Sequence, residues 1–206
     1  MEQRLAPKTK LSEAHLCETF GVGRMRVRRA LLLLASQGII ELQSNRGAYI
    51  SCPDKSEATE VFEARMLIEP PLVRRLAENP DGINLTTLTA HIEMESAARA
   101  KNERTEMIKL SGEFHTKLAE ASGNKFMFRM MRELITKTSL IVGLFGLSQN
   151  ASCPDDEHSQ ILIAIQSKNP SLAENLIISH LNHIQEALDM ETHQVQQDDL
   201  TAILRA

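Results

Sequence analysis

The stretch from Leu11 to Gly47 limits the possible folds of this chain most strongly, because helix starts and helix stops follow one another closely in it. Ser12 precedes a short apolar-periodic run, and the sequence Gly21-Val22-Gly23 interrupts that run. A longer run from Arg24 to Gln37 ends at Gly38, a residue type that favours the left-handed helix stop. These boundaries predict two helices joined by a tight turn.

Two short segments with strand-like alternation follow the second helix. They are Ile39 to Leu42 and Arg46 to Ile50, and the turn residues Gln43-Ser44-Asn45 separate them. This pattern predicts a hairpin, so the whole stretch is interpreted as a helix-turn-helix followed by a wing. The basic tip at Arg46 suits a minor groove or phosphate groups.

The second helix has an apolar side and a basic side. The apolar stripe, which we expect to pack on the first helix, consists of Val27, Ala30, Leu31 and Leu34. The helix start carries four arginines in six residues, namely Arg24, Arg26, Arg28 and Arg29. Arginines at this place in a helix-turn-helix reach base edges or phosphates in the major groove. A solvated basic face without a partner is the alternative interpretation.

Charge is distributed unevenly along the 206 residues. Residues 1–52 contain eight Lys or Arg and four Glu, a net charge of +4, whereas the whole chain carries −4 and the remainder therefore −8. We call residues 1–52 the head. A basic head on an acidic remainder fits a module that docks on DNA while the other part stays away from it.

Cysteine content and hydropathy indicate the compartment. The three cysteines, Cys17, Cys52 and Cys153, are far apart and form no CxxC motif, which argues against a disulfide framework or a zinc finger. No apolar run approaches the roughly 18 residues that span a bilayer. We therefore expect a cytoplasmic protein without a membrane segment.

Residues 56–191, which we call the body, repeat apolar residues at intervals of three and four in six segments. The segments are 56–79, 86–101, 104–122, 125–147, 155–167 and 170–191. We predict a mainly α protein, with a winged helix-turn-helix over residues 1–52, an antiparallel all-α bundle over 56–191 and a tail over 192–206. A polar, proline-containing linker at 51–55 connects head and body.

Three histidines of the body, His115, His158 and His180, each lie on an apolar stripe. Counting along the two last helices places His158 and His180 equally far from their shared turn, about 14 Å at 1.5 Å per residue, so their imidazoles are expected to converge. Three neutral imidazoles suit zinc or a similar divalent ion, with an open position for a ligand oxygen. The alternative is that each is a core histidine satisfied by its neighbours.

The segment LSEAHLCETFGVGRMRVRRALLLLASQGIIELQSNRGAYI resembles the winged-helix module of the GntR family of bacterial transcription regulators. The resemblance implies that Arg24 and Arg28 contact operator DNA and that Arg46 with Gly47 forms the wing tip. The family's module normally begins with a further helix ahead of Leu5. Only four residues stand there in this chain, so we expect either a head that is shortened at its start or a start codon that has been placed late.

Three positions of the head depart from the family pattern. Gly23 replaces the usual serine, Arg26 the usual proline and Arg29 the usual glutamate. Loss of the serine removes a helix cap and a phosphate-binding hydroxyl. The two additional arginines add attraction for phosphate.

In the body, FEARMLIEP, GEFHTKLAEASGNKF and DDEHSQILIAIQSKNPSLAENLIISHLNHI are similar to the ligand-sensing domain of the fatty-acid-regulator-type (FCD) branch of that family. The resemblance implies that His115, His158 and His180 ligate a metal. The family's fourth ligand, an aspartate one turn before the first histidine, is replaced by Ser111. Because a neutral hydroxyl is a poor ligand, a water or an effector carboxylate would complete the shell.

Arg65 and Glu69 match the family's R-x-x-ϕ-E pattern. Their spacing of four is compatible with a simple ion pair on a helix surface. The resemblance implies instead that Arg65 faces the effector pocket, where its guanidinium would bind a carboxylate.

Together these features predict a ligand-responsive transcription regulator rather than an enzyme. We expect it to bind double-stranded operator DNA as a homodimer and to sense a small carboxylate in its body. Two alternatives remain: a metal-dependent hydrolase that activates water at a three-histidine site, and a sensor that no longer binds DNA. The first lacks an evident general base at a suitable spacing from the histidines.

Overall fold

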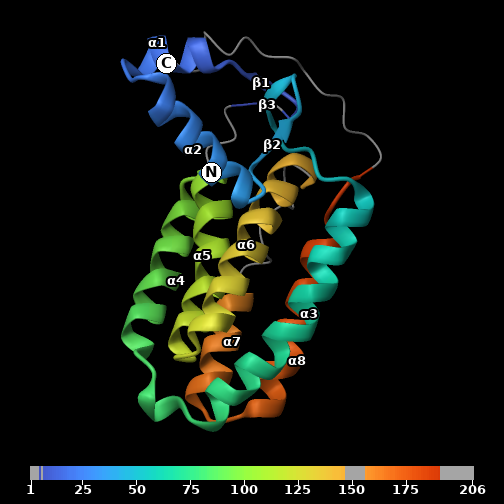
Figure 1. The fold of residues 1–206 in the computed structure, drawn as a ribbon. Helices are drawn as coiled ribbons and strands as arrows, with labels where there is room; N and C mark the ends of the chain where they lie inside the picture. Colours follow the sequence, from blue (N-terminus) through green and yellow to red (C-terminus); the bar gives the residue numbers. More distant parts are fainter. Residues whose placement is uncertain (1–4, 6, 147–155, 191–206) are drawn as a thin grey trace.

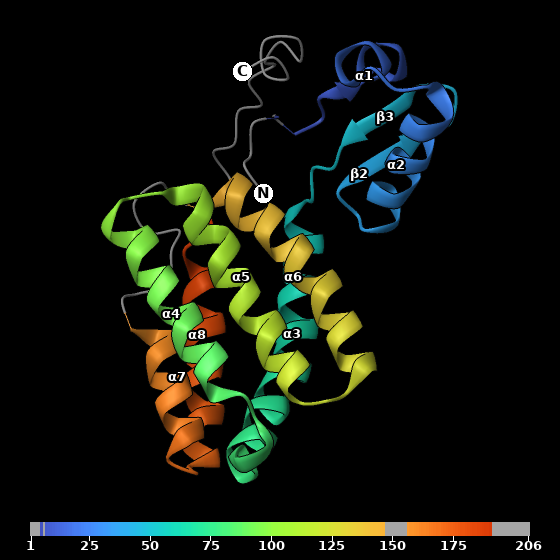
Figure 2. The same ribbon diagram turned by 90° about the vertical axis from the view of Figure 1, so that its left-hand side faces the viewer.

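The computed structural model describes residues 5, 7–146 and 156–190, and all structural statements refer to these residues. Over this range the chain forms eight α-helices, one 3-10 turn and a three-stranded sheet. Figures 1 and 2 show a small N-terminal unit at one end of an elongated helical body. The predicted mainly α fold, with a winged helix-turn-helix preceding a helical bundle, is confirmed.

The head contains the predicted helix-turn-helix and hairpin. Its elements are α1 (Glu13–Phe20), α2 (Arg24–Ser36), β2 (Ile40–Gln43) and β3 (Gly47–Ile50). A further strand, β1 (Lys10–Leu11), pairs antiparallel with β3 and gives the sheet order β1-β3-β2. Sequence periodicity missed β1 because two residues are too few to show an alternation.

The helix ends of the head follow from its cap residues. The Ser12 hydroxyl caps α1 by accepting from the His15 amide, and Gly21 ends α1 with a φ of 62°. Gly23 begins α2 without a side-chain cap, as the missing serine implies.

The apolar core of the head differs from the predicted stripe at one position. Val27 and Leu31 are buried and Leu34 is half-buried against the sheet and α1, but Ala30 is exposed. Including Ala30 was wrong because the buried face of α2 centres between Val27, Leu31 and Ala35, which leaves Ala30 at its edge.

The six predicted helical segments of the body are present. They are α3 (Lys55–Glu78), α4 (Leu85–Ala100), α5 (Arg104–Ala121), α6 (Lys125–Phe145), α7 (Glu157–Gln166) and α8 (Pro170–Glu186), with a 3-10 turn η1 (Pro80–Gly82) after α3. Their apolar faces meet in a core that includes Phe114, Leu118, Ile161 and Ile177, each no more than 1% exposed. This burial holds the helices that carry the three histidines.

No helix of the described ranges is long and apolar enough to cross a membrane. Cys17 and Cys52 are free thiols. Cys153 and the predicted tail over 192–206 lie outside the described residues.

Head and body touch where α2 ends. Gly38, with a φ of 71°, lies so close to Lys137 of α6 that a Cβ at this position would be 3.2 Å from the lysine Cε. The Lys137 ammonium donates to Glu57 at the start of α3, at 2.5 Å. One lysine of the body therefore touches both the end of the head's second helix and the first helix of the body.

A comparison of two glycine substitutions tests this contact. Gly38→Ala and Gly21→Ala both place a side chain in the left-handed region, which costs about 1 to 2 kcal/mol. Nothing lies within 4 Å of a Cβ at Gly21, whereas Gly38→Ala also displaces Lys137. We expect the larger loss in free energy of unfolding, measured with denaturant, for Gly38→Ala. Equal losses would mean that the Lys137 contact contributes nothing.

Candidate metal centre and nucleic-acid interface

Three helices bring the predicted histidines together. His115 of α5, His158 of α7 and His180 of α8 are each at most 4% exposed. The Nε2 atom of His180 lies 3.0 Å from that of His115 and 3.2 Å from that of His158. Tetrahedral ligand nitrogens at zinc–nitrogen distances of about 2.0 to 2.1 Å lie roughly 3.3 Å apart, so this spacing fits one ion.

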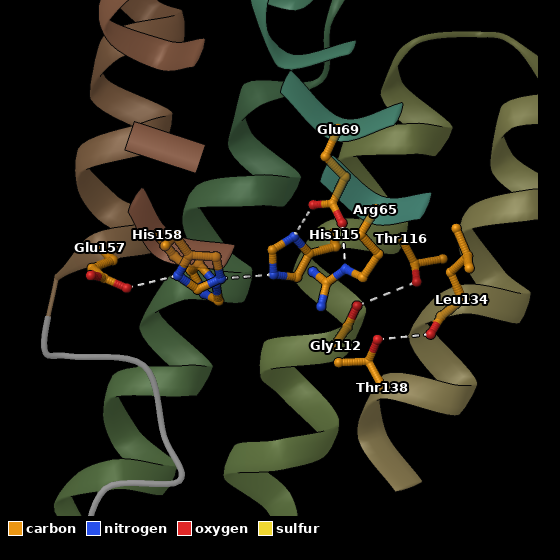
Figure 3. Close-up of polar contacts among 10 residues, drawn as sticks. Arg65, Glu69, Gly112, His115, Thr116, Leu134, Thr138, Glu157 and His158 are labelled. Carbon is orange, nitrogen blue, oxygen red and sulfur yellow. Dashed lines mark hydrogen bonds and ion pairs between the residues drawn. The ribbon is translucent and has the colours of Figure 1, made fainter. Parts of the chain in front are cut away.

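A different carboxylate holds the Nδ1 atom of each histidine. Glu69 of α3 lies 2.6 Å from His115, Glu95 of α4 lies 2.7 Å from His158, and Glu157 of α7 lies 2.7 Å from His180. Figure 3 shows Glu69 and Glu157 on opposite sides of the imidazole cluster. A carboxylate on the outer nitrogen fixes the tautomer and orientation of a metal-bound histidine.

The pKa values favour ionised carboxylates at Glu69 and Glu95 and a neutral ring at His115. Burial would raise the pKa of Glu69, but Arg65 and His115 hold it well below its ordinary value. Burial would also raise the pKa of Glu95, but hydrogen bonds with His158 and His91 lower it to about 2. Burial lowers the pKa of His115 to about 3, against the pull of Glu69. The proton of His115 thus lies on Nδ1, and Nε2 offers its lone pair to the centre of the cluster.

The local charge balance also fits a divalent cation. Three carboxylates surround the cluster, and within the described residues Arg65 pairs with one of them, Glu69. Ions buried without compensation are strongly unfavourable. A doubly charged metal at the three Nε2 atoms would offset the charge of the remaining carboxylates, and nitrogen donors suit zinc better than magnesium or calcium.

Arg65 and Glu69 are buried rather than on a helix surface, so the surface ion pair is excluded. The two side chains are 1% and 3% exposed, and Arg65 Nε donates to Glu69 Oε1 at 2.5 Å. The other oxygen of Glu69 accepts from His115. Among the described residues, Arg65 Nη2 is buried without a hydrogen-bond partner. Such a donor costs about 1 to 3 kcal/mol unless a ligand or water satisfies it.

A small cavity lies between Arg65, Ser111 and His115. Its volume is about 30 Å³, and it is also lined by Gly112 of α5 and by Thr138 and Ser139 of α6. A cavity of this size accommodates water, whereas ligand pockets are usually roughly 300 Å³ or larger. A bound carboxylate therefore requires the surrounding helices to separate.

Two further histidines, His91 and His183, contact carboxylates that hold the cluster. His91 of α4 donates from Nε2 to the Leu110 carbonyl at 2.8 Å and lies 3.3 Å from Glu95. His183 of α8 contacts Glu157, the carboxylate that also holds His180, and its side chain is 48% exposed. The spacing of four residues between His91 and Glu95 could have indicated their contact from the sequence. The pairing of Glu95 with His158 has no such signal, because it joins two helices that are distant in the sequence.

The predicted DNA-contacting arginines lie on the surface of the head. Arg24, Arg26, Arg28 and Arg29 are all exposed on α2. Arg46 and Gly47 are exposed at the turn between β2 and β3, and Gly47 has a φ of 105°. The head thus presents its basic groups outward on the recognition helix and at the wing.

Arg28 differs from the other arginines of the head. Its Nε donates to both carboxylate oxygens of Glu13, at 3.0 and 2.9 Å. Glu13 opens α1, so this ion pair joins the two helices of the helix-turn-helix. No acidic group of the body approaches Arg28 within the described residues, and the guanidinium remains on the head's surface.

Two family models match the chain. Residues 60–183 match the FCD domain, and residues 1–50 match the bacterial regulatory proteins of the gntR family.

Curated relatives are named as transcriptional regulators. The HTH-type regulator YdhC of Bacillus subtilis is 26% identical over 180 residues, which are 86% of this chain and 80% of that protein. LutR of the same organism is 25% identical over 204 residues, 89% of this chain and 93% of that protein. The repressor NanR of Citrobacter rodentium is 26% identical over 194 residues, 84% and 74% of the two chains.

Solved structures support the fold. A GntR regulator from Rhodococcus sp. RHA1 aligns with a TM-score of 0.79 at 19% identity, covering 90% of this chain and 89% of that one. McbR/YncC of E. coli aligns with a TM-score of 0.71 at 18% identity, covering 88% and 87%.

Proposed function

Because this chain belongs to the GntR family of bacterial transcription regulators and carries an FCD domain, we propose that it is a DNA-binding regulator controlled by a small carboxylate. Residues 1–52 form the DNA-binding unit and residues 56–191 the effector-binding unit of this proposal. The observation that carries it is the joint presence of an outward basic recognition helix and a buried three-histidine cluster beside Arg65.

DNA binding is assigned to the head. Arg24 and Arg28 reach base edges, while Arg26, Arg29 and Arg46, with the Gly47 backbone, contact phosphates. A homodimer places two recognition helices on a two-fold operator about one helical turn apart. The exposure of all five guanidinium groups supports this assignment.

Effector binding is assigned to the cluster and its cavity. His115, His158 and His180 hold zinc or a related divalent ion, which supplies an electrophilic position for a carboxylate oxygen. The other carboxylate oxygen accepts from Arg65, whose unsatisfied Nη2 supports this role. Ser111, at the family's aspartate position, leaves the fourth ligand position of the metal to the effector.

Control of DNA binding is assigned to α6. Thr138 and Ser139 line the cavity, and Lys137 on the same turn touches Gly38 at the end of α2. Because the closed cavity is too small for a carboxylate, a ligand must move α6 or its neighbours. Such a movement shifts the Lys137 contact and with it the placement of the head, which links the two binding equilibria.

Metal content tests the effector part of the proposal. We expect purified wild-type protein dialysed against zinc to retain about one ion per chain by elemental analysis, and His158→Ala to retain none. A panel of small carboxylates should raise the melting temperature of the zinc-loaded wild type and leave His158→Ala unchanged. A metal-free wild type, or equal responses of both proteins, would contradict the assignment.

We expect Ser111→Asp to change the affinity for metal and the affinity for the effector in opposite directions. The new carboxylate stands one helical turn before His115 and supplies a fourth, charged ligand, so zinc should bind more tightly. It also fills the position proposed for the effector, so responding carboxylates should bind more weakly. Zinc competition with a chromophoric chelator and ligand titration measure the two effects. Tighter effector binding in Ser111→Asp would refute the open-position account.

A further inference from the structure

We propose that Glu13 positions the Arg28 side chain for contact with a base. This glutamate is then a determinant of sequence specificity, even though DNA repels its negative charge. The inference rests on the DNA-binding function proposed above. The geometry that points to it is the pairing of one arginine Nε with both oxygens of a carboxylate on the preceding helix.

Among the five candidate arginines, Arg28 alone has an acidic partner within the described residues. Because Glu13 engages Nε, the edge of the guanidinium that the two terminal nitrogens form stays available to another pair of acceptors. Two parallel N–H groups of a guanidinium match the O6 and N7 acceptors of guanine. Arg26, Arg29 and Arg46, which are assigned to phosphates above, have no such restraint, and flexible arginines serve well for phosphate contacts that need no fixed direction.

Glu13 is itself held in place. It is the first residue of α1, directly after the cap residue Ser12, and its helix crosses α2 through the apolar core of the head. The backbone that carries the carboxylate is therefore held in place relative to α2. A side chain that is restrained before binding loses less conformational entropy when it binds, so pairing in the unbound protein favours the base contact.

Stability does not account for the pair. The side chains of Arg28 and Glu13 are 58% and 37% exposed, and exposed ion pairs contribute little to folding. A carboxylate on a surface that meets phosphates also weakens non-specific association. The ion pair therefore has its main effect in the complex with DNA. Docking on DNA removes water from the pair and strengthens the interaction between Glu13 and Arg28.

The test compares Glu13→Gln with Glu18→Gln, which removes the same charge from an exposed position of the same helix. The full-length protein is titrated with a duplex selected from random sequence by the wild type, and with a scrambled duplex. For Glu18→Gln we expect both affinities to rise alike. For Glu13→Gln we expect the scrambled duplex to bind no more weakly, while the ratio of the two affinities falls roughly 5- to 100-fold, the range that one lost guanine contact represents.

A second pair of variants excludes a general loss of structure. In an Arg28→Ala background, Glu13→Gln should change the affinity ratio no further, since the residue that it positions is absent. Repeating the selection with Glu13→Gln should show relaxed preference at one base pair of each half-site. Equal affinity ratios for Glu13→Gln and Glu18→Gln would overturn the inference. A wild type without preference for any duplex would instead overturn the proposed function.

Discussion

His180→Ala is expected to abolish zinc binding and the stabilisation that accompanies it. The Nε2 atom of His180 lies within 3.2 Å of both other Nε2 atoms, so its loss leaves two ligands where zinc needs at least three from the protein. At a thousandfold excess of zinc over its dissociation constant, the wild type gains about 4 kcal/mol of folding free energy, and His180→Ala should gain none. Thermal unfolding of each protein, with zinc and with a chelator, measures the stabilisation by zinc in the wild type and in His180→Ala.

His183→Ala is the matched control for this prediction. His183 lies on the same helix and contacts the same Glu157, but its side chain is 48% exposed and is not one of the three clustered histidines. We expect His183→Ala to keep zinc binding within a small factor of the wild type. The metal assignment fails if His180→Ala retains the zinc-dependent rise in melting temperature, or if both variants lose it equally.

Removing the two arginines at the base-reading positions should eliminate sequence-specific DNA binding. A bidentate arginine–guanine contact contributes about 1 to 3 kcal/mol of discrimination, so Arg24→Ala combined with Arg28→Ala should lower operator affinity by roughly 30-fold to 10⁴-fold. Both residues are exposed and lie outside the core of the head. The double variant should therefore keep its fold, which far-ultraviolet circular dichroism checks.

The control combines Arg74→Ala with Arg75→Ala. These two exposed arginines lie near the C-terminal end of α3. Figure 1 shows that this end of α3 lies at the end of the body that is farther from the head. The control removes the same net charge, so it separates a local contact from an overall electrostatic effect. Similar losses of operator affinity in the two double variants would show that α2 does not read the DNA.

Most of the fold was predictable because local patterns and tertiary contacts agree in this chain. Amphipathic periods placed all six body helices, and Gly21 and Gly38 ended the head's helices where glycine alone avoids strain. The prediction failed at Ala30, whose spacing fits the apolar stripe but whose side chain lies at its edge. It also missed β1, whose strand character depends on pairing with distant Tyr49 and Ala48.

The candidate site was predictable in part. Equal distances from a shared turn correctly placed His158 beside His180, since a helical hairpin fixes which residues lie at one height. The carboxylates Glu95 and Glu157 were not predicted as partners of the histidines. Each contacts a histidine on another helix, and residue spacing along the sequence does not show which helices pack together. The hydrogen bond between Glu13 and Arg28 was not predicted for the same reason, because it depends on how α1 crosses α2.

The salt dependence of DNA binding tests the central claim, that the outward arginines of the head bind a polyanion. The measurement titrates full-length protein with the promoter duplex beside its own gene between about 50 and 200 mM salt. We predict that log K falls linearly with log salt, with a slope of about −0.9 for each phosphate neutralised, so that several contacts per head lower the affinity by orders of magnitude. Absent binding, or binding that salt leaves unchanged, would contradict the claim.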